Sequence, residues 1–472
     1  MARDEKIDLC VIGAGPAGIA AAERAAAQGR RVVLVEAGEW GGAAYSRGTL
    51  PAQALAETAE RALQIRSARD LGLSADEPRI NFSRVNARIR AVIEAAMPRV
   101  SPEHLAAQGI EVVSARARFT GPATLEAGGR TIRAGRFLVA TGSRPSVPAV
   151  PGLDAMPFFT PETIIEVTRR PAHLIVLGGG ATGLALAQSH LRLGCPVTVI
   201  EMLDPLTDHD PELAEAVLRR LRAEGLDIRV HTGVVSVSEE GEQVVVETKT
   251  GPDEDRLAGS HLLVATGRRP DLEGLGLEAA KVRMAGGVPV LRRFGRTSSP
   301  RLFVAGDAAG WTGVHAARHS ARAAVDAMFG GGRGRAAIVP RVVHTRPGIA
   351  GVGLTEPEAR ARYGTRFAIV RAGFSQTDAA LARAEPNGHV KVLVDPGGGI
   401  VGAGIVGPHA AELIPVFALA IAQRLGPADL DRLAVPHPSF AQVIALVAGD
   451  YARTHPRAGG AGWRSALKRL LP

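Results

Sequence analysis

The feature that most constrains the fold of this chain is one pattern that occurs twice: strand, glycine-rich turn, helix, strand. The copies are "KIDLCVIGAGPAGIAAAERAAAQGRRVVLVEAGEWGG" (residues 6–42) and "AHLIVLGGGATGLALAQSHLRLGCPVTVIEML" (residues 172–203). Each has a GxGxxG motif after an apolar strand and an acid at the end of the next strand. The motif residues are Gly13, Gly15, Gly18 and Glu36, then Gly178, Gly180, Gly183 and Glu201. We predict an α/β fold with two Rossmann-like dinucleotide-binding domains.

Each residue type in the motif has a physical task. The first glycine permits a tight turn, the second lets the backbone approach a pyrophosphate, and the third lets helix and strand pack closely. The helix N-terminus adds N–H donors and the positive end of a dipole. The closing acid can accept a hydrogen bond from a ribose hydroxyl. Because the Glu201 carboxylate would repel a 2′-phosphate, we predict a preference for NADH over NADPH.

Composition excludes several classes of protein. A length of 472 residues suits two to four domains, and 46% hydrophobic with 22% charged residues argues against general disorder. The chain has no run of eighteen apolar residues, so we expect no membrane-spanning helix. The charged start "MARDEK" lacks a signal-peptide pattern, which predicts a cytoplasmic protein. The net charge of +9 comes with 4% aromatics and dispersed arginines, so we expect no nucleic-acid binding. Cys10 and Cys195 are interpreted as buried small hydrophobes rather than a redox pair.

Two further segments bear on the domain plan. "TSSPRLFVAGDAAG" (residues 297–310) delivers Asp307 from a strand into a glycine turn, where it can hydrogen-bond a polyol chain. Beyond residue 336, "VKVLVDPGGGIVGAGIVG" (390–407) predicts a hairpin, and "HAAELIPVFALAIAQRL" (409–425) predicts an apolar helix. Such a helix in an α+β unit suggests burial at a subunit interface.

Together these motifs resemble the pyridine nucleotide–disulfide oxidoreductases, with dihydrolipoamide dehydrogenase-like and mercuric reductase-like features. The resemblance covers about residues 6–450 and includes both ATG turns (140–142 and 265–267), "VVHTRPGIAGVGLTEPEA" and "PHPSF". It implies FAD in the first site, a nicotinamide nucleotide in the second, and a homodimer formed through the C-terminal unit. The predicted domains are an FAD-binding domain in two parts (1–150 and 271–335), an NAD(P)-binding domain (151–270), a dimerisation domain (336–450) and a basic tail (451–472).

The resemblance also implies which residues contact the cofactors, and we expect no metal site. For FAD they are Gly13, Gly15, Pro16, Ala17, Gly18, Glu36, Ala37, Gly42, Thr141, Gly142, Gly306 and Asp307. For NAD they are Gly178, Gly180, Ala181, Thr182, Gly183, Glu201, Thr266 and Gly267.

The chain departs from the family at its redox centre. The family pattern is roughly GGTCxNxGCxPSKAL, and here residues 41–55 read "GGAAYSRGTLPAQAL". Ala44 and Thr49 stand at the two cysteine positions, and neither can carry electrons. The soluble transhydrogenase likewise has a threonine at the second position. The family's lysine is here Gln53 and its glutamate partner is Ala185, so the pair is lost together; one member left alone and buried would cost about 3–5 kcal/mol.

A third departure lies in "PHPSFAQ" (residues 436–442), where the family pattern HPxxxE orients a histidine base with a glutamate. Here His437 remains and the acid is Gln442, so we expect a less oriented, weaker base in the substrate cleft. Tyr45 can stack on a planar acceptor or pack against the following helix.

These departures favour an FAD-dependent NAD(P)H oxidoreductase that passes electrons directly to a quinone, oxygen, a second nicotinamide or another small oxidant. Lipoamide, glutathione or Hg(II) reduction through a dithiol is not expected. Two alternatives stay open: a redox-silent FAD-bound scaffold, sensor or electron-transfer subunit, and a transhydrogenase. In the tail, one helical face with basic neighbours could touch an anionic membrane, although dimer packing or fraying is the preferred interpretation. That face holds Trp463, Ala466, Leu467, Leu470 and Leu471, with Arg464, Lys468 and Arg469 beside it.

Overall fold

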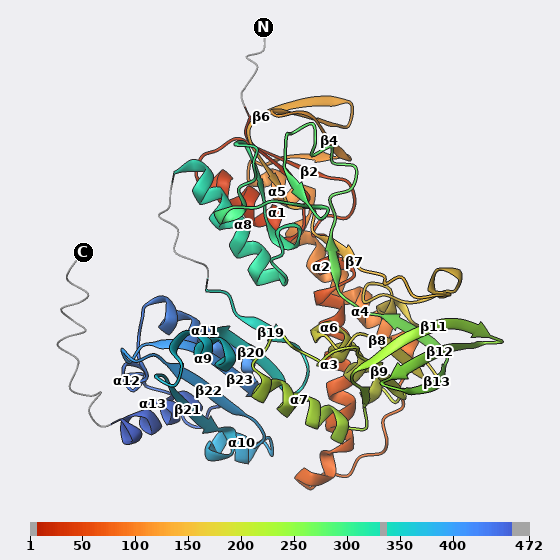
Figure 1. Ribbon diagram of the computed structural model, residues 1–472, viewed down its shortest axis with the longest axis vertical. Coiled ribbons are helices and arrows are strands. Elements are labelled where there is room, and N and C mark those ends of the chain that lie inside the picture. Colours follow the sequence, from red (N-terminus) through yellow and green to blue (C-terminus); the bar gives the residue numbers. More distant parts are fainter. Residues whose placement is uncertain (1–6, 331–337, 456–472) are drawn as a thin grey trace. The chain divides into compact units, whose positions relative to one another are not determined.

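The computed structural model describes residues 7–330 and 338–455, which form two compact units (Figure 1). The first unit takes the described residues up to Gly178, then Ser189–Ile200, then those from Thr232 to 330. The second takes Gly179–Gln188, Glu201–His231 and the described residues from Ile338 onwards. The helical face predicted around Trp463 lies outside the described residues. Within the described ranges, no helix combines the length and apolar character that crossing a bilayer requires.

The first sheet of unit 1 is a parallel sheet extended by an antiparallel hairpin. Its order is β3-β2-β1-β6-β5-β4, and β18 pairs with the far end of β6. Contacts among β1, β2, β3, β6 and β18 are parallel, whereas β4 and β5 run antiparallel. The bounds are β1 Ile7–Ile12, β2 Val32–Glu36, β3 Glu111–Ser114, β4 Ala117–Gly121, β5 Thr124–Ala127, β6 Arg130–Val139 and β18 Leu302–Val304.

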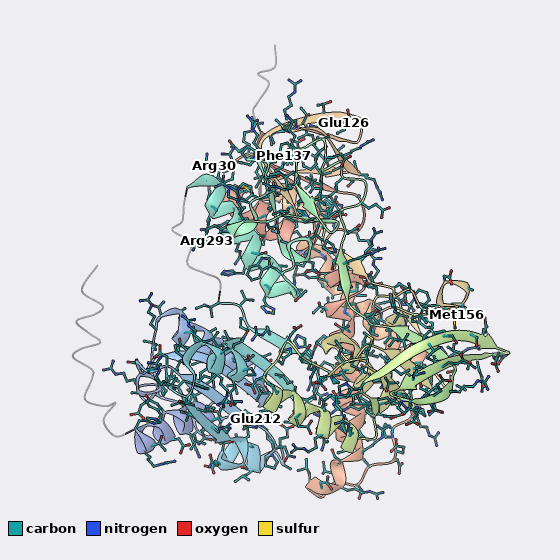
Figure 2. The ribbon with its side chains drawn as sticks, viewed as in Figure 1. Arg30, Glu126, Phe137, Met156, Glu212 and Arg293 are labelled. Atoms are coloured by element: carbon teal, nitrogen blue, oxygen red, sulfur yellow. The ribbon has the colours of Figure 1, made fainter. Side chains whose placement is uncertain are left out.

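The parallel strands are apolar on both faces because each face is covered. In β1, Leu9 and Val11 pack in one hydrophobic cluster and Cys10 and Ile12 in another. Phe137 of β6, labelled in Figure 2, is fully buried. Its ring meets that of Phe119 edge to face, at 5.2 Å between ring centroids. The helices of this unit are α1 Pro16–Ala27, α2 Ala43–Ser46, α3 Thr49–Arg66, α4 Phe82–Ala96, α5 Pro102–Ala107 and α8 Val314–Phe329.

A second parallel sheet in unit 1 has the order β9-β8-β14, from the second repeat of the sequence. It shares a hydrophobic cluster with the antiparallel sheet β11-β12-β13. The bounds are β8 Leu174–Leu177, β9 Val197–Ile200, β14 His261–Val264, β11 Thr232–Glu240, β12 Gln243–Thr250 and β13 Asp253–Gly259. Short pairs are β7 (Ser143–Pro145) with β15 (Arg268–Pro270), and β16 (Met284–Ala285) with β17 (Val288–Pro289). Helix α6 (Ala181–Arg192) follows β8.

Unit 2 is built on an antiparallel sheet of order β19-β20-β23-β22-β21, in which β22 and β23 form the predicted hairpin. Helices α11 and α13 pack against it around a cluster that includes Phe417 and Val447. The strands are β19 Arg341–Val343, β20 Gly348–Gly353, β21 Ala368–Gly373, β22 His389–Val394 and β23 Ile400–Gly407. The other elements are α7 Pro211–Ala223, β10 Asp227–Arg229, α9 Glu356–Tyr363, α10 Asp378–Ala382, α11 Ala410–Ala422, α12 Pro427–Leu430 and α13 Gln442–Thr454.

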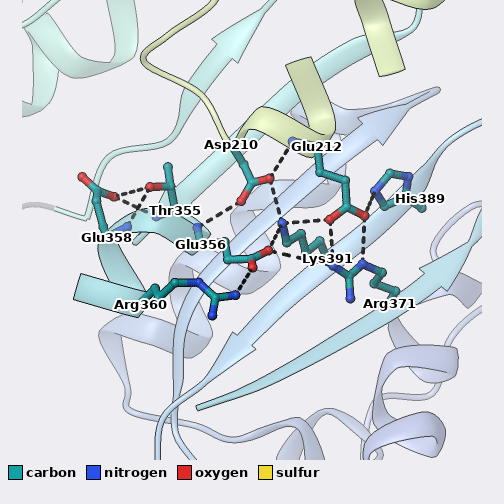
Figure 3. Close-up of polar contacts among 9 residues, drawn as sticks. All are labelled: Asp210, Glu212, Thr355, Glu356, Glu358, Arg360, Arg371, His389 and Lys391. Carbon is teal, nitrogen blue, oxygen red and sulfur yellow. Dashed lines mark hydrogen bonds and ion pairs between the residues drawn. The ribbon is translucent and has the colours of Figure 1, made fainter. Parts of the chain in front are cut away.

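A buried ionic cluster joins α7 and α9 to the sheet within unit 2 (Figure 3). Lys391 on β22 is 3% exposed, and its Nζ lies 2.9 Å from Asp210 Oδ1, 2.9 Å from Glu212 Oε2 and 2.7 Å from Glu356 Oε2. Burial alone would lower the pKa of Lys391, but its hydrogen bonds to the carboxylates outweigh that effect and the pKa is raised. Arg371 donates to both oxygens of Glu212 at 2.8 Å. Arg360 donates to Glu356 Oε1 at 2.7 Å, so three cations face three carboxylates around the buried Lys391.

Candidate functional site

The first glycine turn has the geometry that its sequence predicts. Gly13 has φ +100, and a Cβ there would lie 2.5 Å from the carbonyl oxygen of Ala140. A Cβ on Gly18 would lie 1.7 Å from the carbonyl oxygen of Gly13, so the helix approaches the turn closely. A Cβ on Gly15 meets no atom within 4 Å. The backbone at Gly15 is thus open to a ligand, at the start of a helix that has Pro16 in its first turn.

The acid of the first motif is held by the backbone of the same turn. Glu36 ends β2; its Oε2 accepts from the N–H of Ala14 at 2.5 Å and its Oε1 from the N–H of Gly38 at 2.7 Å. Each carboxylate oxygen keeps capacity for a second hydrogen bond, as a ribose hydroxyl requires. Ala37 follows in the turn after β2. Gly42, at φ +64, passes so close that a Cβ would lie 2.9 Å from Cα of Gly15.

Asp307 lies in a short 3-10 turn, Gly306–Ala309, directly after β18. Gly306 has φ +67, and a Cβ there would lie 2.7 Å from Cβ of Ala17 on α1, so the two turns are neighbours. Asp307 Oδ2 accepts a 2.7 Å hydrogen bond from the hydroxyl of Ser143. Its carboxylate is 26% exposed and thus open to a further donor. This arrangement suits the predicted contact with a polyol chain.

A series of hydrogen bonds and ion pairs, not predicted from the sequence, connects Asp307 through Ser143 to Arg268 and Glu162. Arg268 donates to the Ser143 hydroxyl and to the Ser143 carbonyl, each at 2.7 Å, and to Glu162 Oε1 at 2.7 Å. Arg47 lies 3.7 Å from the other Glu162 oxygen. The one available signal is that Ser143 and Arg268 each follow an ATG turn directly.

The threonine of each ATG turn hydrogen-bonds to the segment that follows the other ATG turn. Thr141 donates from its hydroxyl to the carbonyl of Asp271 at 2.5 Å, and Thr266 does so to the carbonyl of Ser146 at 2.8 Å. Gly142 has φ +75 and Gly267 φ +113, conformations that favour glycine. These residues therefore shape the strand ends, where open parallel sheets bind their ligands.

The second motif repeats these contacts. In unit 1, Gly178 has φ +109, and a Cβ there would lie 2.5 Å from the carbonyl oxygen of Ala265. In unit 2, Glu201 accepts from the N–H of Gly179 at 2.7 Å and from the N–H of Leu203 at 2.9 Å, at the same spacings along the chain as in the first motif. Gly180, like Gly15, leaves open space. Ala181, Thr182 and Gly183 form the first turn of α6.

The segment at the family's dithiol position is a short helix followed by a long one. Ala44 and Tyr45 lie on α2, Thr49 is the first residue of α3, and Gln53 follows one turn later. Ala44 and Gln53 are half-buried and Thr49 is exposed. Tyr45 packs against the hydrophobic cluster under α1 and α8, which among the described residues includes none of the following helix.

The two cysteines have the environment of structural residues. Cys10 lies in the middle of β1 and is completely buried, and Cys195 is 1% exposed. Burial raises the pKa of each thiol to about 12. Because the thiolate is the reactive form, neither residue is suited to redox exchange near neutral pH.

At the C-terminal motif, one expectation needs correction. His437 does have a carboxylate partner: its Nε2 lies 2.7 Å from Oδ2 of Asp378, at the start of α10. Gln442 instead uses its side-chain oxygen to accept from the N–H of Ser439 at 3.4 Å. The partner was missed because it lies 59 residues away, outside any local motif. Both side chains are about two-thirds exposed (64% and 66%), so solvent screens the pair.

The family model for pyridine nucleotide-disulphide oxidoreductases matches residues 7–327, and the model for their dimerisation domain matches residues 339–448. The chain belongs to this family. It is 36% identical to a dihydrolipoyl dehydrogenase of Thermus scotoductus over 449 residues (92% of this chain, 95% of the relative). It is 33% identical to a mercuric reductase of Streptomyces lividans over 463 residues (94% and 96%). The crystal structure of LpdA from Mycobacterium tuberculosis has a TM-score of 0.86 and 26% identity, covering 94% of this chain and 99% of that one.

Membership of the pyridine nucleotide-disulphide oxidoreductases implies the use of FAD and a nicotinamide nucleotide, and the match to the dimerisation domain supports a homodimer. The residues present fit two such nucleotides. Each motif has a second glycine beside open space and an acid fixed by backbone N–H groups. In the part of the chain that the structure describes, no cluster of metal-ligating side chains is found.

Proposed function

We propose that this protein is an FAD-dependent oxidoreductase that takes electrons from NADH and passes them, through FAD, directly to a non-disulfide acceptor. A quinone, oxygen, a second nicotinamide or another small oxidant would serve. The observation that carries the proposal is the absence of sulfur at Ala44 and Thr49, in a chain whose nucleotide motifs are otherwise complete. The burial and raised pKa of Cys10 and Cys195 support it, because neither can replace the relay.

The chain's own groups would bind and orient the reactants. Bound FAD supplies the chemistry, since it accepts hydride from a nicotinamide and returns two electrons to an oxidant. The backbone at Gly15 and the helix start behind it would hold the pyrophosphate of FAD. Asp307, backed by Ser143, would accept hydrogen bonds from its ribityl hydroxyls. The small side chain of Ala44 leaves room beside the ring for an acceptor.

The preference for NADH follows from Glu201. Its two backbone hydrogen bonds fix a carboxylate beside the second glycine turn, where a 2′-phosphate would meet a like charge. A free 2′-hydroxyl can instead donate to the same oxygen.

The test starts with the purified protein and its bound flavin. Anaerobic NADH is expected to bleach the visible flavin absorbance within the mixing time of a stopped-flow experiment. The reduced protein is then mixed with a quinone, oxygen, oxidised nicotinamide analogue, lipoamide, oxidised glutathione or Hg(II). Reoxidation by the quinone or by oxygen, and not by lipoamide, oxidised glutathione or Hg(II), supports the proposal.

Three results contradict parts of it. Unchanged absorbance with both NADH and NADPH favours the redox-silent alternative. Reoxidation by the nicotinamide analogue alone favours a transhydrogenase, for which Thr49 is the specific support. Turnover of disulfide substrates by the unmodified protein refutes the sulfur-free route. The double variant Ala44→Cys/Thr49→Cys is the positive control for those substrates.

A further inference from the structure

A buried ion pair links two helices whose N-terminal ends carry candidate site residues. Arg192, the last residue of α6, donates from Nη1 to Glu60 Oε2 on α3 at 2.6 Å. Their side chains are 6% and 13% exposed. A second contact lies at the end of α3, where Arg66 donates to the carbonyl oxygen of Arg192 at 2.5 Å. Arg192 thus attaches to α3 at two points, nearly two turns apart.

Helix geometry relates this attachment to the segment that replaces the dithiol. An α-helix turns about 100° per residue, so positions 4, 7 and 11 residues apart share a face. Glu60 is seven residues beyond Gln53 and eleven beyond Thr49, so the three lie on one stripe of α3. A rotation or shift of the helix at Glu60 would therefore move Thr49 and Gln53 with it.

Apolar packing alone fixes the register of α3 weakly. The buried residues of this 18-residue helix are mostly small: Pro51, Ala54, Leu55, Ala59 and Ala62. Small side chains form shallow ridges, so neighbouring registers differ little in packing. A buried ion pair has one favourable geometry, and its known use is to specify one arrangement rather than to add net stability.

We propose that Arg192 and Glu60 are positioning residues for the acceptor side of the site: they set the register of α3 and thereby place Thr49 and Gln53. The pair attaches α3 to the last turn of α6, which belongs to unit 1 as α3 does. The sequence predicts a neutral site where Gln53 and Ala185 replace the family's lysine and glutamate. The ion pair lies seven residues beyond each of them, with the acid on α3 and the base on α6. This inference rests on the proposed function.

The test compares Arg192→Met and Glu60→Gln with Arg24→Met. Arg24 forms a 2.8 Å pair with Asp326 that joins α1 to α8 and leaves α3 alone. In both Arg192→Met and Glu60→Gln we expect amide hydrogen exchange over residues 49–66 to rise at least about tenfold. Reoxidation of the reduced flavin by para-benzoquinone should slow by roughly tenfold or more, because small misplacements near the reacting groups are costly. Reduction by NADH should change less than about twofold, and Arg24→Met should alter neither half-reaction.

Two double variants separate positioning from a purely structural role. The reversed pair Glu60→Arg/Arg192→Glu should restore both the exchange rates and the reoxidation rate. The neutral pair Glu60→Leu/Arg192→Met should recover the melting temperature, because apolar replacement removes the buried charges, yet keep the slow reoxidation. If the neutral pair instead shows parental exchange and parental reoxidation, the inference is overturned. If NADH fails to reduce the unmodified protein, the proposed function fails, and the exchange data still decide whether the pair sets the register of α3.

Discussion

Replacing Lys391 with methionine removes the cation at the centre of the ionic cluster in unit 2 while keeping a side chain of similar length. Three carboxylates lose a contact, but not equally. Glu212 and Glu356 each keep an arginine partner, at 2.8 Å and 2.7 Å. Asp210 is 9% exposed, and among the contacts of the described residues it keeps backbone N–H donors at 3.1 Å and 3.0 Å. The perturbation therefore amounts to about one uncompensated buried charge, which costs about 3–5 kcal/mol.

This loss should appear as a lower urea midpoint with an unchanged slope, at fixed protein concentration because the protein is expected to be a dimer. Lys249→Met is the matched control: its pair with Glu254, at 3.2 Å, is 51% and 73% exposed, so less than about 1 kcal/mol should be lost. Adding Asp210→Asn to Lys391→Met should recover part of the stability, because the stranded charge disappears. If Lys391→Met lowers the free energy of unfolding by no more than Lys249→Met, the carboxylates around Lys391 do not depend on its buried charge.

Other predictions concern the nucleotide motifs and pH. Gly15→Ala should fold normally but purify with little FAD, because the added methyl group clashes with no chain atom yet fills the open approach; Gly449→Ala, which also meets open space, should retain FAD. Glu201→Arg should raise the ratio of kcat/KM for NADPH over NADH by roughly tenfold or more, and an unchanged ratio would show that this acid does not discriminate. Burial and nearby Arg341 lower the pKa of His209 to about 4. The unfolded chain therefore binds the proton first as pH falls, and the free energy of unfolding should decline between about pH 6.5 and 4. His209→Gln should flatten that decline in a urea series, and an unaltered slope would contradict the assignment.

The nucleotide motifs were predictable because their physics is local. In each copy, the first glycine lies against the end of a neighbouring strand and the second glycine leaves open space. The acid accepts a hydrogen bond from a backbone N–H of the glycine turn, 22 residues before it. A fixed spacing within one strand–helix–strand unit leaves a pattern that one sequence can show. The hairpin β22–β23 was predictable for the same reason, since its glycines and branched residues lie in one continuous stretch.

The polar contacts behind the motifs were not predictable, because each joins segments far apart in the chain. Asp378 reaches His437 across 59 residues, Arg192 reaches Glu60 across 132, and Lys391 reaches Asp210 across 181. No spacing rule selects such partners from 47 acidic residues. His437 shows the consequence: its local motif lacks an acid, yet Asp378 supplies one in space.

The contacts that shape the two nucleotide turns leave out the side chains at the former dithiol position. Gly13 turns against Ala140, Glu36 binds the backbone of Ala14, and Asp307 binds Ser143. Among the contacts of the described residues, the side chains of Ala44 and Thr49 enter neither these nor the matching ones of the second motif. A chain can therefore exchange both cysteines for alanine and threonine without loosening either turn. The helix that follows has its own fixing point at Glu60, near its opposite end. Substitutions at Ala44 and Thr49 are therefore expected to leave the binding of both nucleotides unchanged.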